Sequence, residues 1–354
     1  MYKGIQIALA ELGGQVNGQP MQLIWLDESN PQVSVQNFTK LADSENVSAV
    51  LGGSNSANTL AMGATAMQRQ VPFISINASA REVTGKNCNP FMFRMPGSIP
   101  AYARAMAPHM LEAGKRWHIL SVSYAFGEDI IATFTDLAKT VGATIVGVDR
   151  APVATTDFSS FVLKARATNP NVVISGAPNV HPILKQIHEL GLGNSMTVAG
   201  PAVSDTDLWA AEPDSLNGIY GKTWYFNDPN NSPEEQAFTK KFIESEGRPP
   251  SDRVFYGWLS MHLLASAIEH AKSADRLAIT KALTSMTLSD GGLPFGFRDW
   301  DHQLTRRLIV GKAQKNDKDK WDVLSVISPK PASVEEVERI YGDKAEIGCN
   351  MDSI

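Results

Sequence analysis

Two short polar turns carry the residues best suited to binding a small ligand. Residues 52–56 read Gly-Gly-Ser-Asn-Ser, and residues 77–79 read Asn-Ala-Ser. Each turn follows a short apolar run and precedes a helical pattern, which is typical of the point where a strand ends and a helix begins. Backbone N–H groups, serine hydroxyls and the positive end of a helix dipole would converge there, and these groups suit a carboxylate. The candidate binding residues are Ser54, Asn55, Ser56, Asn77, Ala78 and Ser79.

Both turns also have a simpler interpretation, because Ser and Asn are common N-cap residues of helices. A single turn of this kind would most often be only a cap. Two turns in adjacent units favour a binding site, since parallel α/β sheets bind ligands at the carboxyl ends of their strands.

The elements around the turns alternate between strand and helix patterns. Apolar runs predict strands at residues 22–27, 48–52, 71–76 and 91–94, and amphipathic patterns predict helices at 1–14, 31–46, after the first turn, and at 99–113. A second alternating series predicts strands at 117–123, 144–148, 171–175, 196–199 and 218–226, with helices at 127–141, 158–167, 181–190 and 205–211. Two such series predict two doubly wound α/β lobes.

A turn-rich connector at residues 227–233 separates this series from the rest of the chain. Helices are predicted at 234–246, 252–272 and 275–286, then a β pattern at 291–327 with a hairpin turn at 317–320, and a polar tail at 329–354. The 354 residues are enough for two domains.

Composition narrows the classes of function. The chain has 32 basic and 37 acidic residues, a net charge of −5 and no basic stripe, which argues against a nucleic-acid partner. With 43% apolar and 19% charged residues it resembles a soluble globular protein, and it contains no apolar run long enough for a transmembrane helix.

The two cysteines, Cys88 and Cys349, are too few for a thiolate zinc site without histidine partners, and neither has one at ligand spacing. They are either free thiols or one disulfide that ties the tail to the first lobe, and a disulfide would indicate an oxidising compartment. Residues 1–14 read as an amphipathic helix rather than a signal peptide, a start that an exported protein in mature form and a cytoplasmic protein would share.

The sequence contains none of the catalytic motifs that would indicate an enzyme. The seven histidines are scattered, no Gly-x-Ser-x-Gly sequence occurs, and nothing pairs a nucleophile with a base. We therefore expect neither an enzyme, nor a cofactor, nor a metal site.

The order and spacing of several segments resemble the periplasmic solute-binding proteins of ABC importers, in their branched-chain amino-acid group. The matching segments are residues 14–20, 27–31, 50–61, 72–79, 93–94, 124–128, 200–201 and 255–271. The resemblance implies a type I periplasmic-binding-protein fold, with two lobes joined by a three-strand hinge near Arg116, Pro250 and Leu304. Lobe 1 would comprise residues 1–116 and 251–304, and lobe 2 residues 117–250 and 305–354.

The resemblance also assigns roles to site residues. It implies that Ser56, the N–H of Ala78 and Ser79 hold the ligand carboxylate, which agrees with the interpretation of the two turns. Aromatic residues of the other lobe, Phe126 with Tyr124 beside it, would close over the ligand, and the loop Ala177, Pro178, Asn179 would form another wall.

One departure from the family bears on the ligand. Amino-acid binders of this group usually carry a Glu after Gly-Pro to accept bonds from the ligand ammonium, and this chain has Ala202 there. A buried ammonium without a carboxylate partner costs several kcal/mol, although Asp205 or Asp207 could substitute. The pattern favours a flat, amino-free acid such as a benzoate, hydroxybenzoate or cinnamate. Trp209 and Tyr225 would then line the pocket or, alternatively, simply pack in the core.

A second departure lies at the start, where the family has a strand and a Gly-rich loop that are missing from this chain. Either the chain is a truncated form that begins at an internal Met, or the first lobe lacks this strand from the middle of its sheet, which would leave two neighbouring strands unpaired.

The sequence thus predicts an extracytoplasmic, periplasmic receptor, a monomer, that closes around a small organic carboxylate and delivers it to an ABC permease in the inner membrane. The alternatives are a branched-chain amino-acid or amide binder, or a cytoplasmic ligand-sensing regulator of the same fold.

Overall fold

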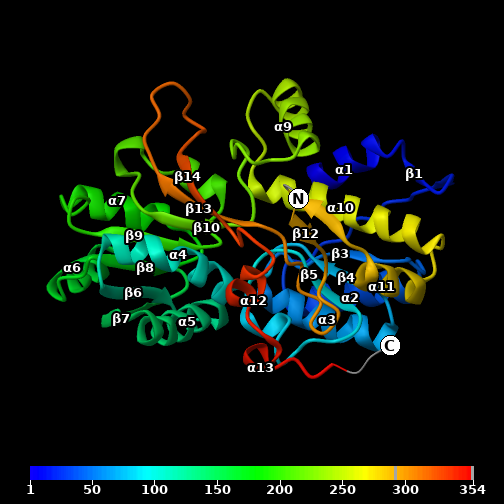
Figure 1. Ribbon diagram of the computed structural model, residues 1–354, viewed down its shortest axis with the longest axis horizontal. Helices are drawn as coiled ribbons and strands as arrows, with labels where there is room; N and C mark the ends of the chain where they lie inside the picture. The colour runs from blue at the N-terminus through cyan, green and yellow to red at the C-terminus, as the bar shows by residue number, and fades with distance from the viewer. Residues whose placement is uncertain (291–292, 352–354) are drawn as a thin grey trace. The chain divides into compact units, whose positions relative to one another are not determined.

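The computed structural model describes residues 1–290 and 293–351, which form two compact units (Figure 1). Unit 1 is formed by residues 1–98, 253–306 and the chain from residue 342 onward, and unit 2 by residues 99–252 and 307–341. The predicted boundaries at residues 250 and 304 each lie two residues before the observed ones, and two longer segments group differently. The helix at 99–113 groups with unit 2 instead of lobe 1, and residues 342–351 group with unit 1 instead of lobe 2.

Unit 1 contains the two polar turns and a small parallel sheet. Its strands lie in the order β3 (Val50–Gly52), β4 (Phe73–Ser75) and β5 (Met92–Arg94). Helices α2 (Pro31–Asp43) and α3 (Ser56–Arg69) pack on this sheet through a core that includes Phe38, Met62 and Phe73. The rings of Phe38 and Phe73 meet edge to face with centroids 5.8 Å apart, so the strands that end at the turns are anchored by apolar packing.

Further elements of unit 1 surround this sheet. They are α1 (Tyr2–Glu11), β1 (Gln15–Val16), β2 (Gln19–Pro20), the 3₁₀ helix η1 (Arg81–Val83), α10 (Asp252–Ala271), α11 (Arg276–Ser285), β11 (Leu288–Asp290), β12 (Leu293–Phe295) and α13 (Lys344–Ile347). The prediction of a regular helix after the second turn is wrong, because only η1 follows it. The start of the predicted β pattern, residues 291–292, lies outside the described residues.

The strand predicted at residues 22–27 is not present. This segment forms no ladder, and Leu23 and Trp25 keep 37% and 55% of their surface exposed. β3 pairs with β4 on one side only, and an apolar groove of about 330 Å³ lies between the segment, residues 48–51 and helix α10. Among the described residues β3 has no partner on its other side, so the apolar run 22–27 has no ladder to join.

Unit 2 is built on a seven-stranded sheet in the order β14-β13-β10-β9-β8-β6-β7. Five strands are parallel: β6 (Arg116–Val122), β7 (Thr144–Ala151), β8 (Val172–Gly176), β9 (Thr197–Pro201) and β10 (Ile219–Lys222). β13 (Leu308–Ala313) and β14 (Leu324–Lys330) extend it as an antiparallel pair, which includes the predicted hairpin.

Helices cover both faces of this sheet (Figure 1). One apolar core joins it to α6 (Ser159–Ala167), α7 (His181–Glu189) and α8 (Asp205–Trp209), and the other joins it to α4 (Ile99–Ala113), α5 (Ala125–Val141) and α12 (Glu336–Tyr341). The short η2 (Pro213–Ser215) and α9 (Pro233–Glu246) complete the unit. The predicted polar tail is therefore partly helical, since both α12 and α13 lie in it.

Cys88 and Cys349 form a disulfide with an S–S distance of 2.02 Å. Both cysteines belong to unit 1, so the bond ties the end of the chain to that unit and does not join the two units. Within the described ranges, we find no helix both long and apolar enough to span a bilayer.

Candidate ligand-binding site

The first turn connects β3 to α3 and depends on one glycine. Gly53 has a φ of +80°, in the left-handed region, and a Cβ there would lie 2.3 Å from Thr59 Oγ1. Asn55 then caps α3, because its side-chain oxygen accepts a hydrogen bond from Asn58 N at 3.0 Å. The N-cap interpretation of this turn is therefore correct for Asn55, and it does not account for Ser56.

A protein carboxylate already occupies part of this turn. The two carboxylate oxygens of Glu28 accept hydrogen bonds from the backbone nitrogens of Gly53 and Ser54, each at 2.9 Å. This geometry shows that the turn binds an anion. It also means that a ligand carboxylate must use other donors.

The second turn is fastened directly to the first. The Asn77 side chain donates to the carbonyl oxygen of Ser54 at 2.7 Å, and Ala80 N donates to Ser56 Oγ at 3.3 Å. Asn77 thus acts between the turns, and Ser56 joins them by accepting a bond while its own hydroxyl proton stays available to a ligand.

Several donors at the joined turns have no acceptor in the part of the chain that the structure describes. They are the backbone N–H groups of Ser56, Ala57, Ala78 and Ser79, together with the Ser79 hydroxyl. Ala78 is fully buried and Ser79 nearly so. Because buried N–H groups are almost always paired in folded proteins, this cluster is suited to an anionic group supplied by a ligand.

A buried arginine stabilises the second turn through a hydrogen bond to its backbone. Arg94, at the end of β5, donates from Nη1 to the carbonyl oxygen of Ala80 and from Nε to Gln303 Oε1, both at 2.6 Å. The Ala80 peptide is therefore fixed on both sides, by Ser56 at its N–H and by Arg94 at its carbonyl. The segment 93–94 resembled the family, but the sequence did not assign a role to Arg94.

The predicted aromatic residues of unit 2 lie at the carboxyl end of β6. Tyr124 is the N-cap residue of α5, and its ring centroid lies 5.8 Å from that of Phe126. Tyr124 keeps 36% of its surface exposed, yet the surrounding protein displaces enough water to raise the pKa of its phenol to about 12. The Tyr124 hydroxyl is therefore a hydrogen-bond donor at neutral pH.

The predicted loop 177–179 follows β8 and lines a pocket of about 540 Å³ within unit 2. Ala177 is buried at its wall, whereas Pro178 and Asn179 are exposed. Ala202 follows β9 with a φ of +58°, an uncommon conformation for a residue other than glycine.

Asp205, a possible substitute for the missing Glu, is engaged within the protein. Asp205 is fully buried, and its carboxylate lies 2.9 Å from Lys222 Nζ and accepts a bond from Asp252 N at 2.7 Å. Lys222 Nζ lies 3.1 Å from the Asp252 carboxylate as well. Burial, together with the nearby charge of Asp252, raises the pKa of Asp205 to about 6 although Lys222 opposes the shift. The Asp205 carboxylate is therefore already bound by protein groups, and its contact with a ligand stays a prediction.

Asp207, the other candidate for an ammonium partner, is also engaged. Its carboxylate accepts hydrogen bonds from the backbone nitrogen of Val180 and from His181 Nδ1. Trp209 and Tyr225 belong to the core of unit 2, where Trp209 Nε1 donates to the Trp321 carbonyl and Tyr225 is fully buried. Their packing interpretation is the correct one.

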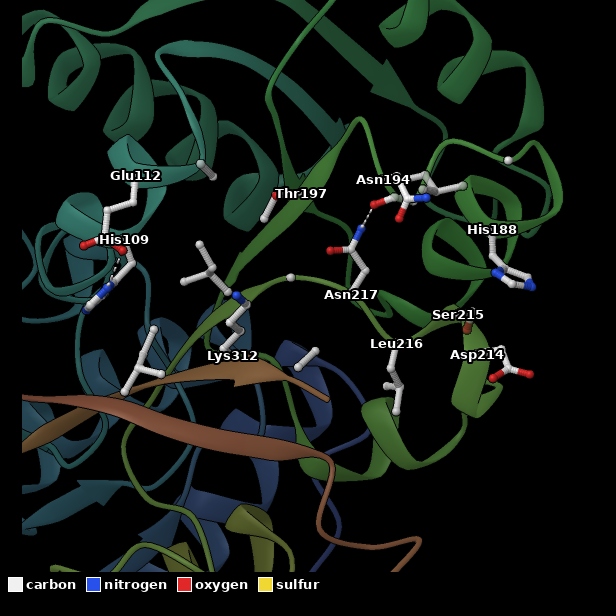
Figure 2. Close-up of a pocket in the computed structure, with 18 residues that line it drawn as sticks. His109, Glu112, His188, Asn194, Thr197, Asp214, Ser215, Leu216, Asn217 and Lys312 are labelled. Carbon is white, nitrogen blue, oxygen red and sulfur yellow. Dashed lines mark hydrogen bonds and ion pairs between the residues drawn. The ribbon is translucent and has the colours of Figure 1, made fainter. Parts of the chain in front are cut away.

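A different pocket of unit 2, of about 840 Å³, contains none of the predicted site residues (Figure 2). It lies at the amino-terminal ends of β9 and β10, whereas loop 177–179 lies at the carboxyl end of the parallel strand β8. Its lining includes His109, Glu112, Thr197 and Lys312. We assign it no role.

Two α/β units, each with polar or aromatic side chains at the carboxyl ends of parallel strands, define a ligand-binding protein of the doubly wound class. Residues 1–319 match the sequence profile of the family described as periplasmic binding protein, and the chain belongs to that family.

Individual relatives are distant in sequence. Leu/Ile/Val-binding protein homolog 4 of Brucella melitensis is 22% identical over 336 residues, which cover 90% of this chain and 80% of that protein. A branched-chain amino acid ABC transporter periplasmic ligand-binding protein from Burkholderia xenovorans LB400 has a TM-score of 0.86 at 24% identity, over 99% of this chain and 94% of that one.

A third relative was solved with a ligand. The solute-binding protein of an ABC transporter from Rhodopseudomonas palustris BisB5, in complex with 3,4-dihydroxybenzoic acid, has a TM-score of 0.83 at 21% identity, over 94% of this chain and 92% of that one. These likenesses show that the chain has the fold predicted from its sequence.

Proposed function

We propose that this protein is the extracytoplasmic substrate-binding component of an ABC importer and that it captures a small aromatic carboxylate. The observation that carries the proposal is the cluster of unpaired donors at the joined turns. Ser56, Ala78 and Ser79 offer backbone N–H groups and hydroxyls to one anionic group. Hydrogen bonds to a charged acceptor are worth about 1.5–3 kcal/mol each, so two or three of them would anchor a ligand firmly.

The two candidate partners for the ammonium group of an amino acid are already engaged. Ala202 stands where amino-acid binders of this type carry a Glu, and the carboxylates of Asp205 and Asp207 are bound to protein groups. Transfer of an unpaired ammonium into a closed site would cost several kcal/mol. This balance favours an acid without an amino group.

The comparisons supply candidates of both kinds. One structural neighbour holds 3,4-dihydroxybenzoic acid, and another is described as a branched-chain amino acid binder. Tyr124 and Phe126 offer a flat apolar surface and a phenol donor, which suits an aromatic ring better than a branched aliphatic chain. A branched-chain amino acid is the competing ligand.

In the proposed cycle, unit 1 holds the carboxylate and unit 2 closes its aromatic residues over the ring. Closure requires that the ligand make contacts in the closed state that it lacks in the open state. The closed, loaded monomer would then deliver the acid to a permease in the inner membrane, from the periplasmic side.

Thermal unfolding against a ligand panel tests the proposal. The panel contains benzoate, 4-hydroxybenzoate, cinnamate, leucine and isoleucine. A ligand at about a hundred times its dissociation constant adds roughly 2.7 kcal/mol to the unfolding free energy, enough for a clear rise in melting temperature. We expect the aromatic acids to raise it and leucine to leave it unchanged. A rise with leucine alone would overturn the aromatic-acid assignment.

A further inference from the structure

The chain passes between the two units at a point that the predicted hinge does not include. Within residues 1–290 and 293–351, the boundaries between the units fall after residues 98, 252, 306 and 341. The hinge predicted from the sequence has three crossings, and the crossing after residue 341 is additional to them. It lies in the segment 336–349, which contains α12 and α13 and which we call the strap.

One end of the strap is held in unit 2. Ile340 and Tyr341, the last two residues of α12, are buried in the apolar core that α12 shares with α4. Arg104, on α4, donates a hydrogen bond from Nη1 to the carbonyl oxygen of Ile340 at 2.9 Å. The burial of two large side chains and a hydrogen bond from a charged donor both oppose displacement of α12 from unit 2.

The other end is held in unit 1, beginning at the next residue. Arg298 donates from Nη1 to the carbonyl oxygen of Gly342 at 2.6 Å, and its own Nε donates to Asp301 Oδ1 at 2.9 Å. Gly342 has a φ of +87°, and a Cβ there would lie 2.9 Å from the side chain of Ile347. The chain therefore turns sharply at Gly342, where unit 1 binds it, and continues into α13.

The disulfide makes the attachment to unit 1 covalent. Asp343 caps α13, since its side chain accepts a hydrogen bond from Glu346 N at 2.9 Å, and Cys349 follows shortly after the helix and is bonded to Cys88. Hydrogen bonds along the strap can be exchanged for bonds to water if the units move apart. The disulfide opens only by reaction with a thiol or another reductant, so it keeps this end of the strap on unit 1.

We propose that the strap limits how far the two units can separate, and that the Cys88–Cys349 disulfide secures its attachment to unit 1. Tyr341 and Gly342 are adjacent, so no slack chain lies between the two attachments. The role in binding rests on the proposed function, in which the units close around a ligand. The apparent affinity for that ligand falls with the fraction of free protein that is competent to bind, so a limit on opening should favour binding.

Distances between two dyes in the ligand-free protein test the inference. The dyes are attached through non-natural side chains at Glu45 in unit 1 and Lys164 in unit 2, both exposed positions. The test variant inserts Gly-Ser-Gly-Ser-Gly between Tyr341 and Gly342, which adds roughly 12 Å of flexible chain and leaves both attachments intact. We expect the distance distribution of this variant to broaden toward longer distances than in the wild type.

The same insertion between Asp317 and Lys318 is the matched control. These residues are exposed in the hairpin turn between β13 and β14, and the whole hairpin belongs to unit 2. This insertion should leave the distance distribution as it is in the wild type. An unchanged distribution in the Tyr341 insertion variant as well would overturn the proposal, because the strap would then restrain nothing.

Removal of the disulfide tests its part in the restraint. In Cys88→Ser combined with Cys349→Ser we expect a broadening smaller than that of the strap insertion, because Arg298 still binds Gly342. A distribution identical to that of the wild type would overturn the role of the disulfide and leave the restraint to the noncovalent contacts.

Ligand affinity separates this inference from the proposed function. If the wild type binds an aromatic acid, the strap insertion should weaken binding ~3-fold or more and the hairpin insertion should not. Equal affinities in the two insertion variants would contradict a role of the strap in binding. If the wild type binds none of the acids, the proposed function fails, and the distances in the ligand-free protein still decide whether the strap restrains opening.

Discussion

The Ser56 hydroxyl oxygen lies 3.3 Å from the backbone nitrogen of Ala80, so a single side chain at the start of α3 fastens the two turns together. Because the oxygen accepts this bond, its proton is directed to another partner. Ser56 therefore supports the shape of the site and, in our proposal, also donates to the ligand.

Replacement of Ser56 should lower ligand affinity by more than its effect on the free energy of unfolding would explain. In Ser56→Ala we expect the affinity for an aromatic carboxylate to fall ~10-fold or more, with a loss of about 1 kcal/mol in the free energy of unfolding. The control is Thr65→Ala, which removes a similarly buried hydroxyl from the same helix, one bonded to the Ala61 carbonyl. It should lower stability by a similar amount and leave the affinity unchanged. Equal affinities in the two variants would remove Ser56 from the site.

Glu28 should contribute to stability through the first turn. In Glu28→Gln one of the two carboxylate oxygens becomes an amide NH₂, which faces the N–H of Gly53 or Ser54 and leaves it unpaired. We expect a loss of about 1–3 kcal/mol in urea denaturation. Glu45→Gln, at an exposed position, should stay within about 0.5 kcal/mol of wild type. If Glu28→Gln were as stable as Glu45→Gln, the hydrogen bonds from Glu28 would not contribute to the stability of the turn.

The buried cluster of Lys222, Asp205 and Asp252 should contribute strongly to the free energy of unfolding, so substitution of Lys222 should be costly. Lys222→Met removes a buried cation that lies 2.9 Å from the Asp205 carboxylate and 3.1 Å from the Asp252 carboxylate, which should cost about 3–5 kcal/mol. The exposed pair Lys139 and Asp136 is the comparison, and Lys139→Met should cost about 0–1 kcal/mol.

Adding Asp205→Asn to Lys222→Met should restore part of the lost stability, because it removes one of the stranded charges. If the double variant were no more stable than the single one, the ion pair would not account for the loss.

His302 should make unit 1 sensitive to acid. The imidazole is buried against the ring of Phe93, with centroids 4.1 Å apart, and burial lowers its pKa to about 4. The unfolded chain takes up this proton near pH 6.5 and the folded chain does not, so the contribution to stability is complete above pH 6.5 and is lost as pH falls toward 4. The loss should reach roughly 3 kcal/mol.

Urea denaturation at pH 7, 5.5 and 4.5 measures this effect. His302→Asn, whose side chain tolerates the left-handed backbone at this position (φ +57°), should flatten the pH profile. An exposed-site variant, His188→Asn, should keep the slope of the wild type. An unchanged slope in His302→Asn would assign the acid sensitivity to other groups.

Local signals predicted much of the fold. The helix at residues 99–113 was predicted with its observed bounds, and the two turns were found because apolar runs stop at small polar residues. The run 22–27 was predicted as a strand on its apolar pattern alone. Whether such a run becomes a strand depends on a neighbouring strand, and β3 does not pair with it.

The contacts that shape the site were not predictable in the same way. Glu28 reaches Gly53 from a segment with no regular structure, and Lys222 meets Asp252 across 30 residues of chain. These pairs form through tertiary packing, and the hydrophobic periodicity of the sequence does not predict which distant residues will meet. The resemblance to a family named Ser56 and Ser79, which lie at the joined turns. The sequence pattern could not show that Asp205, a possible substitute for the missing Glu, is fully buried.

The central claim is that the joined turns of unit 1 bind a carboxylate. The most direct test compares benzoate, or the tightest aromatic acid of the panel, with its carboxamide by calorimetric titration. The two differ little in size and shape, but only the acid offers a charged acceptor to Ser56, Ala78 and Ser79. We predict that the carboxamide binds at least ~100-fold more weakly, since charged acceptors strengthen each bond by about 1 kcal/mol or more. Equal affinities for the acid and the amide would contradict the account.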